Sequence, residues 1–404
     1  MIFRMESSFN MGSQKQVVYV TRPSFLDLSL LTVEALSEIV KVHFCIEISP
    51  ESWQSGLLDV EKPEIDAGVH DGVSFLERSF PSSFQKYWNK CASISLIVYT
   101  NRRSIHPDTW LVTHQAMKHI RKIQPAIVHF DDVSLRLALG LFELNNFPIV
   151  LNIHDAEAHS GEHNWRKDLS RWIAFRKTKR FILHSNFSRK IFLERYKVLN
   201  SKVTMIPLGI YSIYREWAAA EMPEEPKTVL FFGRISPYKG VEVFIKAATL
   251  VAASTFNCRF IIAGKPITGY SLPSLPQLEN GNRFEIYQNY LENTEVAQIL
   301  SRSSFVVCPY LDASQSGVIL TAYAFNKPVI ASNIGGLPEY VLNNETGFLV
   351  PPGDPHALSE SIKELLLNPS KRSGMVRKIM QRERSDLNWD VIARSIVNVY
   401  EKIV

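Results

Sequence analysis

Short β-rich runs alternate with segments of helical periodicity along this chain of 404 residues, and no other feature restricts its fold as much. QVVYVT (16–21) and VHFCIEI (42–48) lie on either side of residues 27–40, whose apolar side chains recur at helical spacing. Strand, helix and strand in this order predict a parallel sheet with crossover helices. The runs that continue the alternation are ISLIVYT (94–100), AIVHF (126–130), PIVLNIH (148–154) and RFILHSN (180–186).

Two stretches interrupt the alternation. Residues 50–90 are rich in Ser, Pro, Asp and Glu, and we expect a surface excursion there with little regular structure. Residues 218–227 mix proline with charge and lack an apolar period, which predicts a linker. The chain is about twice as long as a typical domain. The sequence therefore predicts two α/β domains, at 16–217 and 228–388, after a flexible tail at 1–15.

The composition is that of a globular protein, because 46% of the residues are hydrophobic and 21% are charged. No run approaches the roughly 18 apolar residues that span a bilayer, and residues 1–16 are too polar for a signal peptide. The four cysteines are far apart and lie in or beside apolar runs, which indicates reduced core residues. These features favour a cytoplasmic protein.

The second domain contains a polar loop, Asp312 to Gly317, that opens a predicted helix before the β-rich run 329–332. The free N–H groups at such a helix start attract an anion such as a phosphate. Arg234 follows another predicted strand and Lys239 begins the next helix, so both cations can converge on the same point. The alternative is an ordinary α/β domain whose helix is capped by its own serines.

The run ASQSGV, followed by AYAF-x-KPVIA, resembles the nucleotide-sugar site of one subgroup of the family 4 retaining glycosyltransferases. The resemblance extends from about residue 16 to the C-terminus and is sharper in the second half. It implies the GT-B fold, in which two Rossmann-like domains with parallel sheets face a central cleft. In that fold the amphipathic last helix, within residues 389–404, crosses back to the N-terminal domain.

The resemblance also assigns roles to individual residues. Arg234 and Lys239 match the family's Gly-Arg…Lys-Gly motif, whose cations hold the donor diphosphate. The loop residues implied to bind the same diphosphate are Ser314, Gln315, Ser316, Gly317 and Val318. The residues implied to lie near the nucleoside are Gly264, Tyr290 and Thr321.

The chain departs from the family at its acidic pair, Glu-x7-Glu, of which the first acid contacts the donor sugar and the second the ribose. Asp312 lies near the first position and Thr321 aligns with the second, one residue further apart than the motif allows. Losing the second carboxylate replaces a charge-assisted bond by a neutral one, weaker by about 1 kcal/mol. The first loop also lacks the family's Gly-Gly turn and reads Arg22-Pro23-Ser24-Phe25.

His154 and Asp155 follow a predicted strand, at the edge where ligand-binding groups of α/β sheets collect. The alternative is that they cap the following helix. In the family this loop carries a histidine near the transferred sugar. His154, Asp155 and Asp312 are therefore the candidate catalytic residues.

Residues 162–178 combine Trp165, Trp172 and Phe175 with five Lys and Arg residues and one His, in the most basic part of a chain whose net charge is +5. Such a helix can lie on an anionic membrane surface. Alternatively it packs on the sheet while its long basic side chains cover apolar surface. The first reading implies a cytoplasmic protein that is peripheral on the inner face of the cell membrane.

We therefore expect a metal-independent, retaining glycosyltransferase that uses a nucleotide-diphosphate sugar and no other cofactor. Its acceptor would be a saccharide or a lipid-linked saccharide, in the synthesis of a surface polysaccharide or glycoconjugate. The sequence has no Asp-x-Asp for a metal and no P-loop, and we expect no nucleic-acid partner. The alternatives are a nucleotide-sugar epimerase of the same fold and a non-catalytic protein that binds sugar nucleotides.

Overall fold

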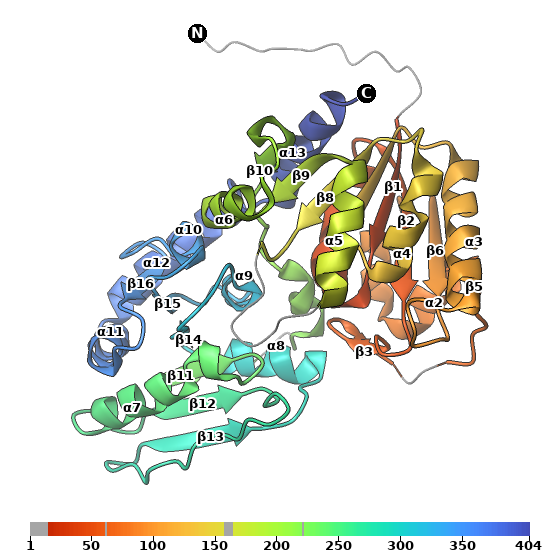
Figure 1. Ribbon diagram of the computed structural model, residues 1–404. Coiled ribbons are helices and arrows are strands. Elements are labelled where there is room, and N and C mark those ends of the chain that lie inside the picture. The colour runs from red at the N-terminus through yellow and green to blue at the C-terminus, as the bar shows by residue number, and fades with distance from the viewer. Residues whose placement is uncertain (1–14, 61–62, 157–164, 220–221) are drawn as a thin grey trace.

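The computed structural model describes residues 15–60, 63–156, 165–219 and 222–404. The chain forms two α/β units, each built around a sheet with helices on both faces (Figure 1). The linker predicted at 218–227 lies between the last 3-10 turn of the first unit, Ser212–Trp217, and the first strand of the second, and residues 220–221 lie outside the described part.

The N-terminal sheet has eight strands in the order β10-β9-β8-β7-β1-β2-β6-β5. All neighbours are parallel except β5, which pairs antiparallel with β6 at one edge. The strands are β1 (Gln16–Thr21), β2 (Lys41–Ile48), β5 (Gly68–Asp71), β6 (Ser93–Val98), β7 (Ile127–Asp131), β8 (Ile149–Ile153), β9 (Thr178–Leu183) and β10 (Val203–Met205).

Two separate cores cover the two faces of this sheet, because alternate residues of a strand point to opposite sides. Val17 and Tyr19 of β1 pack with α1, whereas Val18 and Val20 pack with α3, α4 and α5. Figure 1 shows α3, α4 and α5 side by side over one face. The helices of this unit are α1 (Leu26–Ser37), α2 (Val73–Ser79), α3 (Pro107–Ile123), α4 (Leu135–Gly140), α5 (Trp165–Lys177) and α6 (Asn186–Tyr196).

The C-terminal sheet has six parallel strands in the order β13-β12-β11-β14-β15-β16. They are β11 (Thr228–Phe232), β12 (Arg259–Ala263), β13 (Arg283–Tyr287), β14 (Phe305–Cys308), β15 (Val329–Ser332) and β16 (Gly347–Val350). The helices are α7 (Val241–Ala252), α8 (Asn293–Arg302), α9 (Gly317–Ala324), α10 (Leu337–Tyr340), α11 (Pro355–Leu367), α12 (Pro369–Glu383) and α13 (Trp389–Glu401).

The last helix, α13, packs against the N-terminal unit. Its apolar face joins the core beside α1, and the Tyr400 hydroxyl lies 2.6 Å from Nδ1 of His129 on β7. At its other end the Trp389 indole N–H donates to the Ile210 carbonyl at 2.8 Å. The chain thus returns to its first domain after completing the second.

Residues 50–90 contain more regular structure than the sequence indicates. They form a small hairpin of β3 (Gln54–Ser55) and β4 (Leu58–Asp59), the edge strand β5, and α2. Trp53, Phe75, Phe84 and Trp88 are buried in the core beside α1. The polar composition of this stretch conceals these aromatic anchors, because the elements between them are too short to show a period.

Candidate active site

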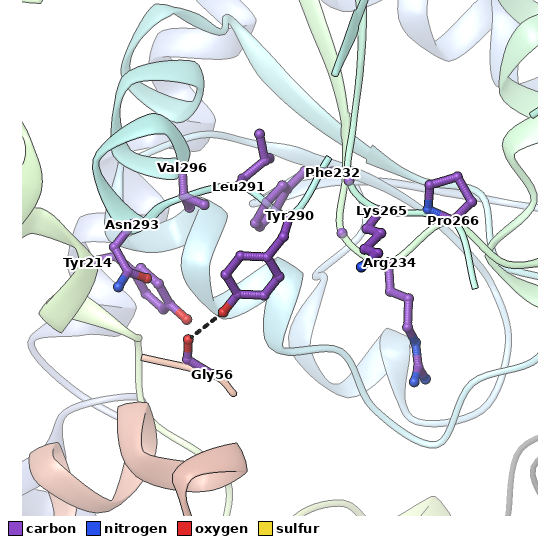
Figure 2. Close-up of a pocket in the computed structure, with 12 residues that line it drawn as sticks. Gly56, Tyr214, Phe232, Arg234, Lys265, Pro266, Tyr290, Leu291, Asn293 and Val296 are labelled. Atoms are coloured by element: carbon purple, nitrogen blue, oxygen red, sulfur yellow. Dashed lines mark hydrogen bonds between the residues drawn. The ribbon is translucent and has the colours of Figure 1, made fainter. Parts of the chain in front are cut away.

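A pocket of about 350 Å³ lies where the two units meet. Gly56 and Tyr214 line it from the N-terminal unit, while the strand-end and loop residues of the C-terminal unit form the rest. Figure 2 shows the Tyr290 side chain reaching across this boundary to the Gly56 carbonyl. Among the lining residues from the C-terminal unit are Phe232, Arg234, Gly264, Tyr290, Leu291 and Asn293.

The two cations predicted from the sequence lie close to one aromatic pair. Nη2 of Arg234 is 3.3 Å from the Tyr238 hydroxyl, and Nζ of Lys239 lies 3.9 Å from the centre of the Tyr310 ring. Lys239 is also 5.4 Å from the Tyr238 ring centre. Arg234 is exposed and reaches out past the other pocket residues in Figure 2. Arg234 therefore lines the pocket, and Lys239 lies beside Tyr238, the residue that Arg234 contacts.

The helix start predicted to bind an anion lies beside these cations. α9 begins at Gly317, and the Tyr310 ring that contacts Lys239 carries a hydroxyl 3.1 Å from Oγ of Ser316. Val318 lies next to the end of β11, since a Cβ atom on Gly233 would sit 3.1 Å from its Cγ2. The first N–H groups of α9 and the two cations thus belong to one surface, as a bound diphosphate requires.

The loop before α9 also touches the N-terminal unit. The Ser314 hydroxyl donates to Oδ1 of Asp155 at 3.1 Å. Oε1 of Gln315 is buried and has no hydrogen-bond partner within the described part of the chain. Asp312 lies partly buried in the same loop.

The residues expected near the nucleoside occupy different positions. Gly264 lines the pocket and requires glycine, because its φ is +148° and a Cβ atom would lie 2.0 Å from the Gly233 carbonyl oxygen. The Tyr290 hydroxyl donates to the Gly56 carbonyl at 3.0 Å. Thr321 is buried one turn inside α9, where its hydroxyl donates to the Gly317 carbonyl at 2.9 Å. Gly264 and Tyr290 therefore share the pocket, and Thr321 bonds to its own helix.

His154 lies at the end of β8 in a buried polar network. Its Nε2 is 3.3 Å from Oδ1 of Asp131, a carboxylate with no solvent exposure. The other donors to this carboxylate are the Asn152 amide and the hydroxyls of Tyr19 and Ser29, at 2.5, 2.6 and 2.6 Å. Asp131 therefore fixes the orientation of the His154 ring.

The His154 ring is stacked between two others. Phe25 of the first loop lies on one side at 4.1 Å between ring centres, and His184 is at 4.9 Å. Burial lowers the pKa of His184 to about 3, so this ring is neutral near pH 7. Within the described residues, neither Nδ1 of His154 nor Nε2 of His184 has a hydrogen-bond partner. Two buried ring nitrogens thus remain available to a ligand.

Asp155 connects the candidate site to α5. Its Oδ2 lies 3.6 Å from Nζ of Lys167, and its backbone carbonyl accepts a hydrogen bond from the Arg171 guanidinium. Because Ser314 bonds to the same carboxylate, Asp155 joins the loops of the two units.

Two residues near the pocket carried no sequence motif. Asp27 is the second residue of α1, where its carboxylate accepts hydrogen bonds from the Leu28 N–H at 2.9 Å and from the Tyr214 hydroxyl at 3.3 Å. Burial raises the pKa of Asp27 to about 6, although both hydrogen bonds oppose the shift. Gly56 comes from the small β3–β4 hairpin. The only sequence signal for either residue was its position near the first strands.

Across the described ranges, no group of three or more His, Cys, Asp and Glu side chains is arranged to hold a metal ion. In the same residues no helix has the length and apolar character needed to cross a bilayer.

Comparison with known protein families matches the two units separately. Residues 73–211 match the family described as Glycosyltransferase Family 4, and residues 226–368 match Glycosyl transferases group 1. Glycogen synthase of Mycobacterium tuberculosis is 28% identical over 291 residues, which is 69% of each chain. D-inositol 3-phosphate glycosyltransferase of Corynebacterium glutamicum is 29% identical over 189 residues, only 45% of each chain.

Solved structures share the architecture over nearly the whole chain. A glycosyltransferase from Rickettsia africae has a TM-score of 0.65 at 17% identity, covering 97% of this chain and 99% of its own. The Anabaena protein HepE in complex with UDP has a TM-score of 0.65 at 16% identity, covering 96% and 100%. At these identities the likeness establishes the fold.

Proposed function

This chain is a glycosyltransferase of the GT-B fold, and we propose that it transfers a sugar from a nucleoside-diphosphate sugar to a saccharide or lipid-linked acceptor. We infer that the transfer retains the anomeric configuration and needs no metal. We propose that this transfer takes part in the synthesis of a surface polysaccharide or glycoconjugate in the cytoplasm. The observation that carries the donor class is the surface shared by Arg234, Lys239 and the start of α9 beside the pocket between the units.

That surface suits a leaving diphosphate on electrostatic grounds. Glycosyl transfer moves negative charge onto the diphosphate, and stabilising this charge is the main task of the site. Two cations and the partial positive charge of a helix N-terminus can do this without a metal. The HepE structure, which has the same fold, is a complex with UDP, and this supports a nucleotide donor.

The N-terminal unit would position the sugar and the acceptor. His154, held by Asp131, presents a buried ring nitrogen, and Asp155 is linked to the donor loop through Ser314. Both can accept hydrogen bonds from sugar hydroxyls. In a retaining transfer the acceptor attacks from the face that the diphosphate leaves, so these groups and Asp312 would surround the anomeric carbon.

A first prediction tests the diphosphate site. Arg234→Ala and Lys239→Ala should each weaken binding of the nucleoside diphosphate by about 10- to 100-fold, because each removes a charge-assisted contact. Thermal shift against UDP, GDP and ADP identifies the base, since a ligand specific for the native state raises its stability. Isothermal titration then measures the affinities with and without EDTA.

The matched control is Lys246→Ala, which removes an exposed lysine of α7 away from the pocket and should leave affinity unchanged. Binding that survives EDTA supports a metal-free site. Equal affinities for the wild type and both pocket variants would refute the assignment. Product analysis with acceptor separates transfer, which forms a new glycoside, from epimerisation, which returns an altered nucleotide sugar.

A further inference from the structure

Three tryptophans are exposed on one face of the N-terminal unit. Trp110 on α3 is 65% exposed, and Trp165 and Trp172 on α5 are 59% and 58% exposed. Phe142, in the 3-10 turn Leu141–Leu144 after α4, is 49% exposed. Tryptophan normally buries most of its large surface. We call these four side chains the aromatic face.

The aromatic face is continuous across its helices, which lie side by side in Figure 1. The Trp110 ring stacks on His114, whose Nδ1 lies 3.0 Å from Glu143, the neighbour of Phe142. The Phe142 ring in turn lies 4.5 Å from Nζ of Lys177 at the end of α5. A series of contacts thus joins α3, the 3-10 turn and α5.

Side chains of α5 divide between the core and this face. Ile173 and Ala174 are buried against the sheet, whereas Trp165 and Trp172, seven residues apart, lie on the same exposed side. The helix therefore packs on the sheet and also presents aromatic rings to its surroundings. Residues 162–164, which the sequence placed in this helix, lie outside the described residues.

Positive charge accompanies the aromatic rings. The Arg176 guanidinium lies 3.4 Å from the Trp172 ring centre, and Arg166 lies 5.7 Å from that of Trp165. α5 carries five basic residues and a single acid, Asp168. The nearby acid Glu143 is paired with Arg121 at 2.7 Å. The face is thus aromatic and net positive.

We propose that the aromatic face docks the protein on an anionic lipid surface. Tryptophan rings are favoured at the depth of lipid headgroups, and Lys and Arg beside them attract anionic phosphates. A second copy of the chain fits less well, because two net positive faces repel each other. Peripheral attachment of this kind uses the side of a helix and does not require a span.

Docking would place the candidate site near the lipid. α5 contacts Asp155 through Lys167 and Arg171, so the helix that meets the membrane also holds a residue of the cleft. If the proposed transfer is correct, this arrangement favours a lipid-linked acceptor over a soluble saccharide. Membrane binding itself is independent of the transfer reaction.

The test is co-sedimentation of the full chain with vesicles of phosphatidylcholine, with and without phosphatidylglycerol. We expect the wild type to pellet with the anionic vesicles at low salt, and less at high salt. Replacing two exposed rings in W110S/W172S should lower the partition coefficient at least about tenfold. The matched control is Phe256→Ser, a 60% exposed aromatic residue of the C-terminal unit, which should bind like the wild type.

Three outcomes count against the proposal. A wild type that stays in the supernatant overturns it, and so does a double variant that pellets like the wild type. Equal pelleting with neutral vesicles overturns the role of charge. Nucleotide binding, measured by thermal shift on the same samples, should be unchanged in W110S/W172S, so its loss would indicate damage to the fold.

Discussion

Asp27 and Asp131 lie at the same edge of the N-terminal sheet in opposite electrostatic environments. Burial by itself raises the pKa of Asp131, but hydrogen bonds and nearby charges, His154 foremost, lower it well below the ordinary value. For Asp27 burial prevails and raises the pKa to about 6. One carboxyl is thus firmly charged, while the other exchanges its proton near neutral pH. Neighbouring acids whose pKa values differ in this way can take different roles at one site.

A second prediction concerns stability and pH at Asp27. The pKa of Asp27 is higher in the folded protein than in the unfolded chain. Its favourable contribution to the stability of the folded protein is therefore fully present below about pH 4 and is lost as the pH rises through about 6. Asp27→Asn, which cannot ionise, should be close to neutral at low pH. At about pH 8 it should stabilise the protein by about 2 kcal/mol. Urea unfolding of both proteins across this range measures the difference.

The sign of the pH dependence decides this second prediction. A difference in the free energy of unfolding between variant and wild type that grows with pH agrees with a carboxyl whose pKa is raised by burial. If this difference in the free energy of unfolding shrinks as pH rises, or stays constant, Asp27 is not desolvated in the folded protein. His184 acts in the opposite direction, because its lowered pKa removes stability as pH falls below about 6.5.

At the scale of elements, α6 and α10 are joined by one carboxylate. Glu339 of α10 accepts hydrogen bonds from the backbone N–H groups of Asn186 and Phe187, at 2.7 and 2.9 Å, and from the Asn186 amide at 3.0 Å. These are the first two residues of α6, where unpaired N–H groups and the helix dipole favour an anion. An element of the C-terminal unit thus completes a helix of the N-terminal unit.

A third prediction follows from this contact. Glu339→Gln keeps the size of the side chain but removes its charge and one of its acceptor oxygens, so we expect a loss of about 1–2 kcal/mol in the free energy of unfolding. The control is Glu345→Gln. Glu345 forms a half-exposed pair with Lys378 at 3.7 Å and should change stability by less than about 0.5 kcal/mol. Equal losses in the two variants would contradict a specific role for Glu339.

The regular elements could be predicted from sequence wherever an apolar pattern was long enough. α1 overlaps the helical pattern at 27–40, and β1, β7 and β8 match the β-rich runs within two residues. The β3–β4 hairpin was missed because its strands have two residues each. β13 was missed because its face carries charge, including Glu285, which lies 3.1 Å from Arg302.

At the scale of the whole molecule, the pocket depends on contacts between units that no local pattern encodes. The sequence motifs lead to Arg234, Gly264 and Tyr290, which share the pocket as C-terminal residues. Its N-terminal wall, Gly56 and Tyr214, comes from segments that become neighbours only in the folded protein. Pairing between units is a property of the tertiary structure, so the motifs lead to the C-terminal wall of this pocket and not to Gly56 or Tyr214.

The last prediction concerns this N-terminal wall. Gly56 has φ +62°, and a Cβ atom there would lie 2.5 Å from the Pro23 carbonyl oxygen, so Gly56→Ala must displace the hairpin. Displacement would break the 3.0 Å hydrogen bond from Tyr290 to the Gly56 carbonyl and open the pocket. Because Tyr290 and Gly56 both line the pocket, we expect affinity for the nucleoside diphosphate to fall about fivefold, the loss expected for one weakened ligand contact.

Gly269→Ala separates this displacement from backbone strain. Gly269 also has a positive φ, +81°, but a Cβ atom there would meet nothing within 4 Å. Both variants should lose about 1 kcal/mol of stability, because alanine disfavours the left-handed backbone conformation that each glycine adopts. Only Gly56→Ala should weaken nucleotide binding in titration calorimetry. Similar affinities in the two variants would mean that the hairpin borders the pocket without shaping it, and that the C-terminal unit alone determines donor binding.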